Sequence, residues 1–107
     1  MTTVSKLQAL PRDVQELAES AVGEGFRFVQ RLVEEFESGA NTFGRPGEAL
    51  FEVREAGKLV AIGGLNVDPF VERGSVGRVR RLYVHPAHRA RGIGRSLVEA
   101  IESEAAR

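Results

Sequence analysis

Residues 80–97 read RRLYVHPAHRARGIGRSL and combine a strand signal, a basic loop and the start of a helix. The predicted strand runs over about Gly77 to Val84. It ends at His85-Pro86, because proline removes a ladder donor and forces its predecessor into extended geometry. Apolar side chains then recur at helical spacing from Ile93 to Ala105, which predicts a helix. Gly92 and Gly94 lie where the loop meets this helix.

The loop has the features of an anion-binding site. Gly92 and Gly94 allow a ligand to approach the backbone because they lack a Cβ. The first amides of the helix point outward at the positive end of its dipole, an arrangement that suits phosphate and favours a pyrophosphate. Residues 75–98 contain six arginines and no acid; the six are Arg78, Arg80, Arg81, Arg89, Arg91 and Arg95. Charge alone leaves a solvated basic strand and loop as an alternative.

Two other phosphate loops do not fit this spacing. A P-loop requires Gly-Lys-Ser/Thr, but Gly94 is followed by Arg95-Ser96. A dinucleotide fingerprint requires a third glycine where Leu97 stands. Nucleotide hydrolysis and a Rossmann cofactor are therefore disfavoured.

The preceding sequence predicts two helices and a hairpin, which gives a mixed α+β fold. One amphipathic helix begins near Pro11 and ends near Gly23, and a second carries Phe26, Val29, Val33 and Phe36 as core residues and ends at Gly39. After a loop over 40–48, strands over 51–54 and 59–67 form the hairpin, with a further strand expected around 3–9. Gly63-Gly64 indicates a bulge or a close backbone approach, and residues 68–75 a loop whose Phe70 caps the core.

The composition describes a single domain spanning residues 1–107. The chain has 15 basic and 15 acidic residues and no cysteine, which excludes disulfides, thiolate nucleophiles and cysteine-ligated metals and favours the cytoplasm. Secretion and membrane insertion are not indicated, because no apolar run approaches the roughly 20 residues of a membrane span. No metal site is predicted: His85 and His88 have no acidic or cysteine neighbour in the sequence and are expected to face solvent.

The Arg-x-x-Gly-x-Gly pattern from Arg89 to Gly94, with the strand and His85-Pro86 before it, resembles motif A of the GNAT superfamily of acetyltransferases. The similarity covers about Gly77 to Arg107, and two helices followed by a hairpin also match the family's order. The resemblance implies acetyl-coenzyme A as cosubstrate and transfer of its acetyl group to a small-molecule or peptide amine by direct attack in a ternary complex. The residues implied to contact pantetheine are Leu82, Tyr83 and Val84; those implied to contact the pyrophosphate are Arg89, Arg91, Gly92, Ile93, Gly94 and Arg95.

The sequence departs from the family in its catalytic residues, so none is assigned. Arg78 stands where many members have a glutamate base, and Tyr83 lies in the motif strand rather than at the position of the family's acid tyrosine. The carboxylates of Glu52, Asp68 and Glu72 are expected to be ordinary solvated groups. The sequence stops at Arg107, without the strands and helix that follow this helix in the family.

Two non-catalytic alternatives remain open. The first is a silent acyl-coenzyme A-binding module. The second is a nucleic-acid-binding module that uses the stretch from Arg78 to Arg95, which the sequence pI of about 6.7 disfavours. An uncovered sheet edge and an apolar helix face favour a dimer or higher oligomer. Asn66, together with Gly63 and Gly64, is a candidate for shaping an acceptor cleft.

Overall fold

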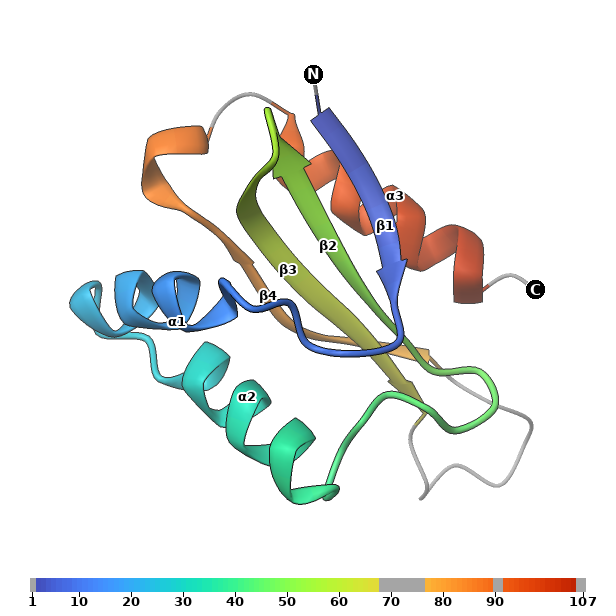
Figure 1. Cartoon of the computed structure of the whole chain (residues 1–107). Coiled ribbons are helices and arrows are strands. Elements are labelled where there is room, and N and C mark those ends of the chain that lie inside the picture. The colour runs from blue at the N-terminus through green and yellow to red at the C-terminus, as the bar shows by residue number, and fades with distance from the viewer. Residues whose placement is uncertain (1, 68–76, 90–91, 106–107) are drawn as a thin grey trace.

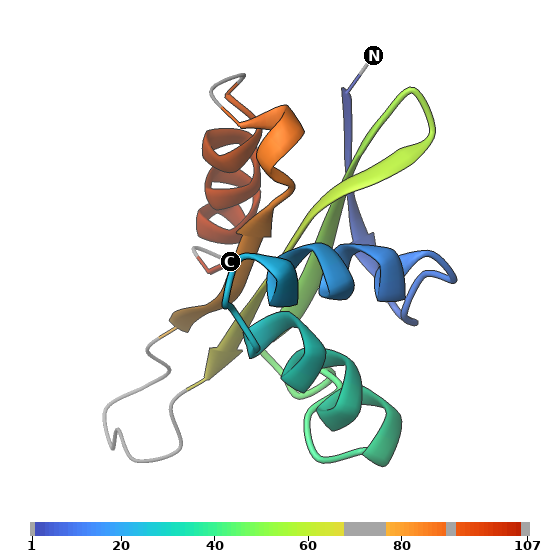
Figure 2. The same ribbon diagram turned by 90° about the vertical axis from the view of Figure 1, so that its left-hand side faces the viewer.

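A four-stranded antiparallel sheet has helices on both faces, α1 and α2 on one and α3 on the other (Figures 1 and 2). This computed structural model describes residues 2–67, 77–89 and 92–105. The elements are β1 (Thr2–Leu7), α1 (Val14–Gly23), α2 (Phe28–Ser38), β2 (Ala49–Glu55), β3 (Lys58–Val67), β4 (Gly77–Val84), a 3₁₀ turn (Pro86–His88) and α3 (Ile93–Ala105). The predicted α+β fold is confirmed, including the weak N-terminal strand signal.

The strands follow the order β1-β2-β3-β4, and each pair of neighbours is antiparallel. The predicted hairpin joins β2 and β3 through Ala56-Gly57, both at positive φ, as in the turns whose twist matches that of paired strands. β1, the strand expected around residues 3–9, pairs with the outer side of β2 and completes the four-stranded sheet. Within the described residues β4 pairs with β3 alone, so its other edge is free.

Each face of the sheet buries its own apolar cluster. Between the sheet and α1 and α2 lie Val14, Leu17, Ala18, Ala21, Val29, Leu32, Val33, Phe43, Leu50, Leu59, Ile62 and Tyr83. Between the sheet and α3 lie Ala49, Phe51, Val53, Val60, Ala61, Leu65, Ile93, Leu97 and Ile101. A register shift at Val53/Arg54 adds one residue to β3 and explains why the consecutive Val60 and Ala61 both belong to the α3 cluster.

The second helix begins later than predicted. α2 starts at Phe28 rather than near Phe26, because Gly25 adopts φ 90° and turns the chain between the two helices. The prediction that Phe26 is a core residue is therefore wrong: it is 44% exposed. The end of α2 is as predicted, at Gly39 in the left-handed region. None of the helices among the described residues is long and apolar enough to cross a membrane.

The Gly63-Gly64 pair confirms the predicted irregularity. Between the partners Ile62–Tyr83 and Gly64–Arg80, β4 contains one residue more than β3. The close approach comes from side chains: a Cβ on Gly63 would lie 2.8 Å from Leu82 Cδ1, and one on Gly64 would overlap the ring of Phe43. Larger residues at either position would displace buried side chains.

Several predictions fall outside the described residues. They include the whole loop over 68–75, with the capping role of Phe70 and the carboxylates of Asp68 and Glu72. Arg91 also lies outside. The side chains of Arg78, Arg80 and Arg81, on β4, are likewise not described.

Candidate functional site

The turn from β4 to α3 is built by local hydrogen bonds. The His85 amide still donates to the Val60 carbonyl at 2.8 Å, which extends the pairing with β3 by one residue. The His85 Nδ1 then accepts from the Ala87 amide at 3.1 Å and caps the 3₁₀ turn that Pro86 begins. The chain thus leaves the sheet at His85-Pro86, as the sequence predicts.

The two glycines of the turn differ in what the fold requires of them. Gly92 has φ 76°, a left-handed conformation that residues with a Cβ rarely adopt. At Gly94 a Cβ would meet only Val84 Cγ2 at 3.6 Å, an ordinary van der Waals contact, so the fold itself tolerates a side chain there. The Ser96 amide donates to the Gly92 carbonyl at 3.0 Å, so the amides of residues 93–95 precede the first helical hydrogen bond of α3.

Arg89 makes a dense set of contacts after the 3₁₀ turn. Its Nε donates to the Val84 carbonyl at 2.9 Å, and its two terminal nitrogens donate to Glu24, at 2.9 Å to Oε2 and 2.6 Å to Oε1. Glu24 is the C-cap residue of α1, so this ion pair connects the end of that helix to the end of β4. Arg89 holds the pKa of Glu24 below its usual value, and Glu24 raises the pKa of Arg89.

Tyr83 joins the same cluster from β4. Its hydroxyl donates to Glu24 Oε1 at 2.6 Å and lies 3.1 Å from Ser20 Oγ, while the Arg89 guanidinium lies 5.5 Å from the ring centroid. The ring of Phe28 packs edge-on against Tyr83 at 6.1 Å. Desolvation raises the pKa of Tyr83, and its hydrogen bond to Glu24 adds to the rise.

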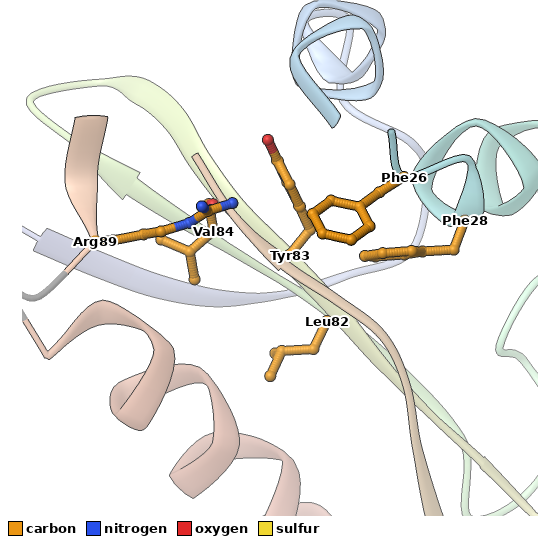
Figure 3. Close-up of a pocket in the computed structure, with 6 residues that line it drawn as sticks. All are labelled: Phe26, Phe28, Leu82, Tyr83, Val84 and Arg89. Carbon is orange, nitrogen blue, oxygen red and sulfur yellow. The ribbon is translucent and has the colours of Figure 1, made fainter. Parts of the chain in front are cut away.

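An apolar cavity of about 350 Å³ lies along this part of β4 (Figure 3). Its lining residues are Phe26, Phe28, Leu82, Tyr83, Val84 and Arg89. Successive strand residues point to opposite faces: Tyr83 points toward α1, and Leu82 points to the side of α3. The cavity therefore follows the backbone of the strand, at the edge left free by β3.

The predicted coenzyme contacts that the structure describes lie at the end of β4, in the turn after it and at the start of α3. Leu82 and Val84 are half-buried, and Tyr83 is buried. Ile93 is only 3% exposed and packs its side chain in the α3 cluster, so its backbone amide is the group it presents to the turn. Arg95 is exposed on the first turn of α3, whereas the Arg89 guanidinium is held by Glu24.

Two expectations about nearby polar residues are wrong. His88 does have an acidic neighbour, because its Nδ1 lies 3.3 Å from Glu55 Oε2 at the end of β2. Glu52 is not solvated: it is buried, and both of its oxygens accept from Arg54 Nε at 3.1 Å. Within the described residues no group of three or more potential metal-ligating side chains occurs.

Asn66 lies within a buried hydrogen-bonded network. Its amide donates to Glu48 Oε2 and Asn41 Oδ1, both at 3.1 Å, and its oxygen accepts from Asn41 Nδ2 at 3.0 Å. With 8% of its surface exposed, Asn66 ties the loop before β2 to the end of β3. The suggested role in an acceptor cleft stays a prediction.

No sequence pattern predicted that Phe26 and Phe28 line the cavity or that Glu24 lies beside it. Glu24 and Arg89 are 65 residues apart, and no local pattern joins them. One signal was present: Glu24 stands between Gly23 and Gly25 at the end of a helix, where a negative charge opposes the dipole. A residue that is locally unfavourable often has a tertiary or functional role.

Comparisons with known proteins agree with this geometry. The family model for the acetyltransferase (GNAT) family matches residues 13–107. An IAA acetyltransferase of Azospirillum brasilense is 36% identical over 64 residues, which are 60% of this chain and 40% of that protein.

Solved structures share the fold. A "putative acetyltransferase" from Exiguobacterium sp. 255-15 superposes with a TM-score of 0.87 at 30% identity, over 98% of this chain and 69% of that one. A structure from Clostridium acetobutylicum, "predicted acetyltransferase with acetyl-CoA", gives a TM-score of 0.67 at 19% identity, over 99% of this chain and 74% of that one. At that identity the second likeness concerns the fold alone.

Proposed function

This chain belongs to the acetyltransferase (GNAT) family, and from that membership we propose that it binds acetyl-coenzyme A and transfers the acetyl group to an amine. The observation that carries the proposal is the apolar cavity along Leu82, Tyr83 and Val84, at the edge of β4 that pairs with no other strand among the described residues. This part of β4 is followed by the glycine turn and the first amides of α3. Members of this family use acetyl-coenzyme A or another acyl-coenzyme A as donor, which supports the choice of cosubstrate.

The residues of the turn fit the two ends of such a molecule. Free backbone edges pair with amide-containing chains, so Leu82, Tyr83 and Val84 are proposed to contact the pantetheine arm. The amides of Gly92, Ile93 and Gly94 are proposed to hold the pyrophosphate, with the charges of Arg89, Arg91 and Arg95 around it. Packing within the fold does not require a glycine at position 94, because a Cβ there would make only an ordinary contact. A ligand that approaches this backbone closely would require one, which supports this placement.

The proposed reaction is a direct attack of a neutral amine on the thioester carbonyl in a ternary complex. The C–N bond of the new amide forms, the C–S bond breaks, and coenzyme A leaves as its thiol with the proton that the amine loses. When bound, the coenzyme supplies the thioester that carries the acetyl group. The protein contributes mainly by fixing the acyl carbonyl beside β4 and by aligning the amine, which is a positioning effect rather than acid–base catalysis. The proposal assigns no general acid or base, and it includes a small-molecule or peptide amine as acceptor.

Calorimetric titration tests the binding step. Acetyl-coenzyme A and coenzyme A are expected to bind more tightly than ADP, because ADP offers only the phosphate contacts. No binding of any of the three to the folded chain would refute the proposal. Turnover with a panel of amines then separates an acetyltransferase from a silent acyl-coenzyme A-binding module, which would bind without releasing free thiol.

A further inference from the structure

Two residues that line the cavity beside β4, Tyr83 and Arg89, belong to a brace between two distant parts of the chain. Glu24, at the end of α1, accepts from both terminal nitrogens of Arg89 and from the Tyr83 hydroxyl. Arg89 is itself fixed to the end of β4 through its bond to the Val84 carbonyl. The same carboxylate thus holds two of the residues that line the cavity.

The corner between α1 and α2 follows directly after Glu24. The Phe26 amide donates to the Ala21 carbonyl at 2.9 Å, which fixes the corner to the end of α1. The Phe26 ring packs against the Phe28 ring with 5.7 Å between their centroids, and the Phe28 ring packs in turn against Tyr83. These aromatic rings form one wall of the cavity opposite Val84 and Arg89 (Figure 3).

Resting on the proposed function, we propose that Glu24 is a positioning residue of the coenzyme site: through Arg89 and Tyr83 it holds the aromatic corner against β4, where the acylated pantetheine arm lies. A carboxylate at a helix C-terminus opposes the helix dipole, so its placement is locally unfavourable and is offset here by Arg89. Arg89 then contributes to binding chiefly by fixing Glu24, and the backbone amides of α3 take the larger share of the pyrophosphate.

A competing role for Glu24 predicts the opposite change in coenzyme affinity. If Glu24 were an internal anion that competes with the pyrophosphate for Arg89, removing its charge would free Arg89 and tighten the binding of both acetyl-coenzyme A and ADP. If Glu24 positions the corner, removing its charge weakens acetyl-coenzyme A and leaves ADP unchanged, because ADP does not reach the aromatic wall.

Calorimetry on Glu24→Gln is the test, with Glu19→Gln, an exposed position on the same helix, as the matched control. The expected result is a loss of about tenfold in acetyl-coenzyme A affinity, the size typical of a wall residue that orders an apolar contact, with ADP affinity unchanged. Glu24→Asp keeps the charge and is expected to recover part of the loss. Unchanged or tighter acetyl-coenzyme A binding in Glu24→Gln would overturn the proposal.

A second readout does not depend on coenzyme. The chain has one tyrosine and no tryptophan, so an ultraviolet titration reports Tyr83 alone. Glu24→Gln is expected to lower the Tyr83 pKa, because a carboxylate that accepts a hydrogen bond from the Tyr83 hydroxyl and repels the phenolate is removed while Arg89 stays nearby. An unchanged titration would refute the brace itself. A wild-type chain that binds no coenzyme would instead refute the proposed function, and the titration would still decide whether Glu24 holds Tyr83.

Discussion

Replacing Gly94 with glutamate is expected to abolish coenzyme binding while leaving the chain folded. A Cβ at this position would touch only Val84 Cγ2 at 3.6 Å, and the backbone has no positive φ. Removing a glycine from a helix gains roughly 0.5–1 kcal/mol, and an acid in the first turn adds about 0.3–1 kcal/mol through the dipole. The free energy of unfolding should therefore rise by about 1 kcal/mol.

Coenzyme binding by Gly94→Glu should weaken, although the protein becomes more stable. A glutamate at Gly94 places bulk and negative charge in front of the amides that we propose hold the pyrophosphate. Hydrogen bonds to a charged group are each worth about 1.5–3 kcal/mol, so losing two costs at least about 3 kcal/mol, or roughly a hundredfold in Kd. Gly92 is a less suitable site, because Gly92→Glu, although also expected to abolish binding, would add backbone strain at φ 76°.

Calorimetry with acetyl-coenzyme A measures the binding change, and urea unfolding measures the stability change. Gly94→Ala and Gly94→Gln separate the contributions of a small side chain, of bulk and of charge, and the losses should increase in that order. Wild-type affinity in a folded Gly94→Glu protein would refute the placement of the pyrophosphate at α3.

Three further predictions concern stability and assembly. Asp13 binds Arg54 through two bonds of 2.9 Å, and these bonds lower the Asp13 pKa, so their stabilisation is present above pH 3.8 and is lost as pH falls through the folded pKa. Asp13→Asn should lower the unfolding free energy by roughly 1 kcal/mol at pH 7, with a smaller difference at pH 3 in urea titrations. Gly64→Ala should lose about 1–3 kcal/mol by the same assay because its methyl group would displace the buried Phe43 ring, and a variant as stable as wild type would contradict that packing. Light scattering is expected to find a dimer or higher oligomer of the 11.7 kDa chain, and a strict monomer at working concentration would exclude the expected assembly.

The elements were predictable because each carries a local signal. Period-two alternation, helical spacing and glycine or proline at the ends gave both N-terminal helices, the hairpin, β4 and α3 close to their observed bounds. The error at Phe26 has a local cause: its spacing continues the apolar face of α2, but the left-handed Gly25 rotates it out of that face. The spacing of apolar residues alone does not reveal that the helix is interrupted at Gly25.

At the candidate site, the turn from β4 to α3 was predictable because its signals are local, whereas the predicted coenzyme contacts stay predictions. Gly92 and Gly94 identified the turn because their effect is local. The pairing of Arg89 with Glu24 depends on how α1 packs across the sheet, and the contact of Glu55 with His88 depends on the register of β2 and β3. Both join residues far apart in sequence, so neither could be read from the pattern of charges.

The shared use of β3 by both apolar clusters has a consequence for the motions of the molecule. Leu59 and Ile62 belong to one cluster and Val60, Ala61 and Leu65 to the other, so neither layer can loosen without exposing the same strand. Both layers should therefore unfold cooperatively, and their amides should exchange hydrogen most slowly. Phe26 belongs to neither cluster and is 44% exposed, so amides at the corner between α1 and α2 should exchange hydrogen faster than those of the two layers.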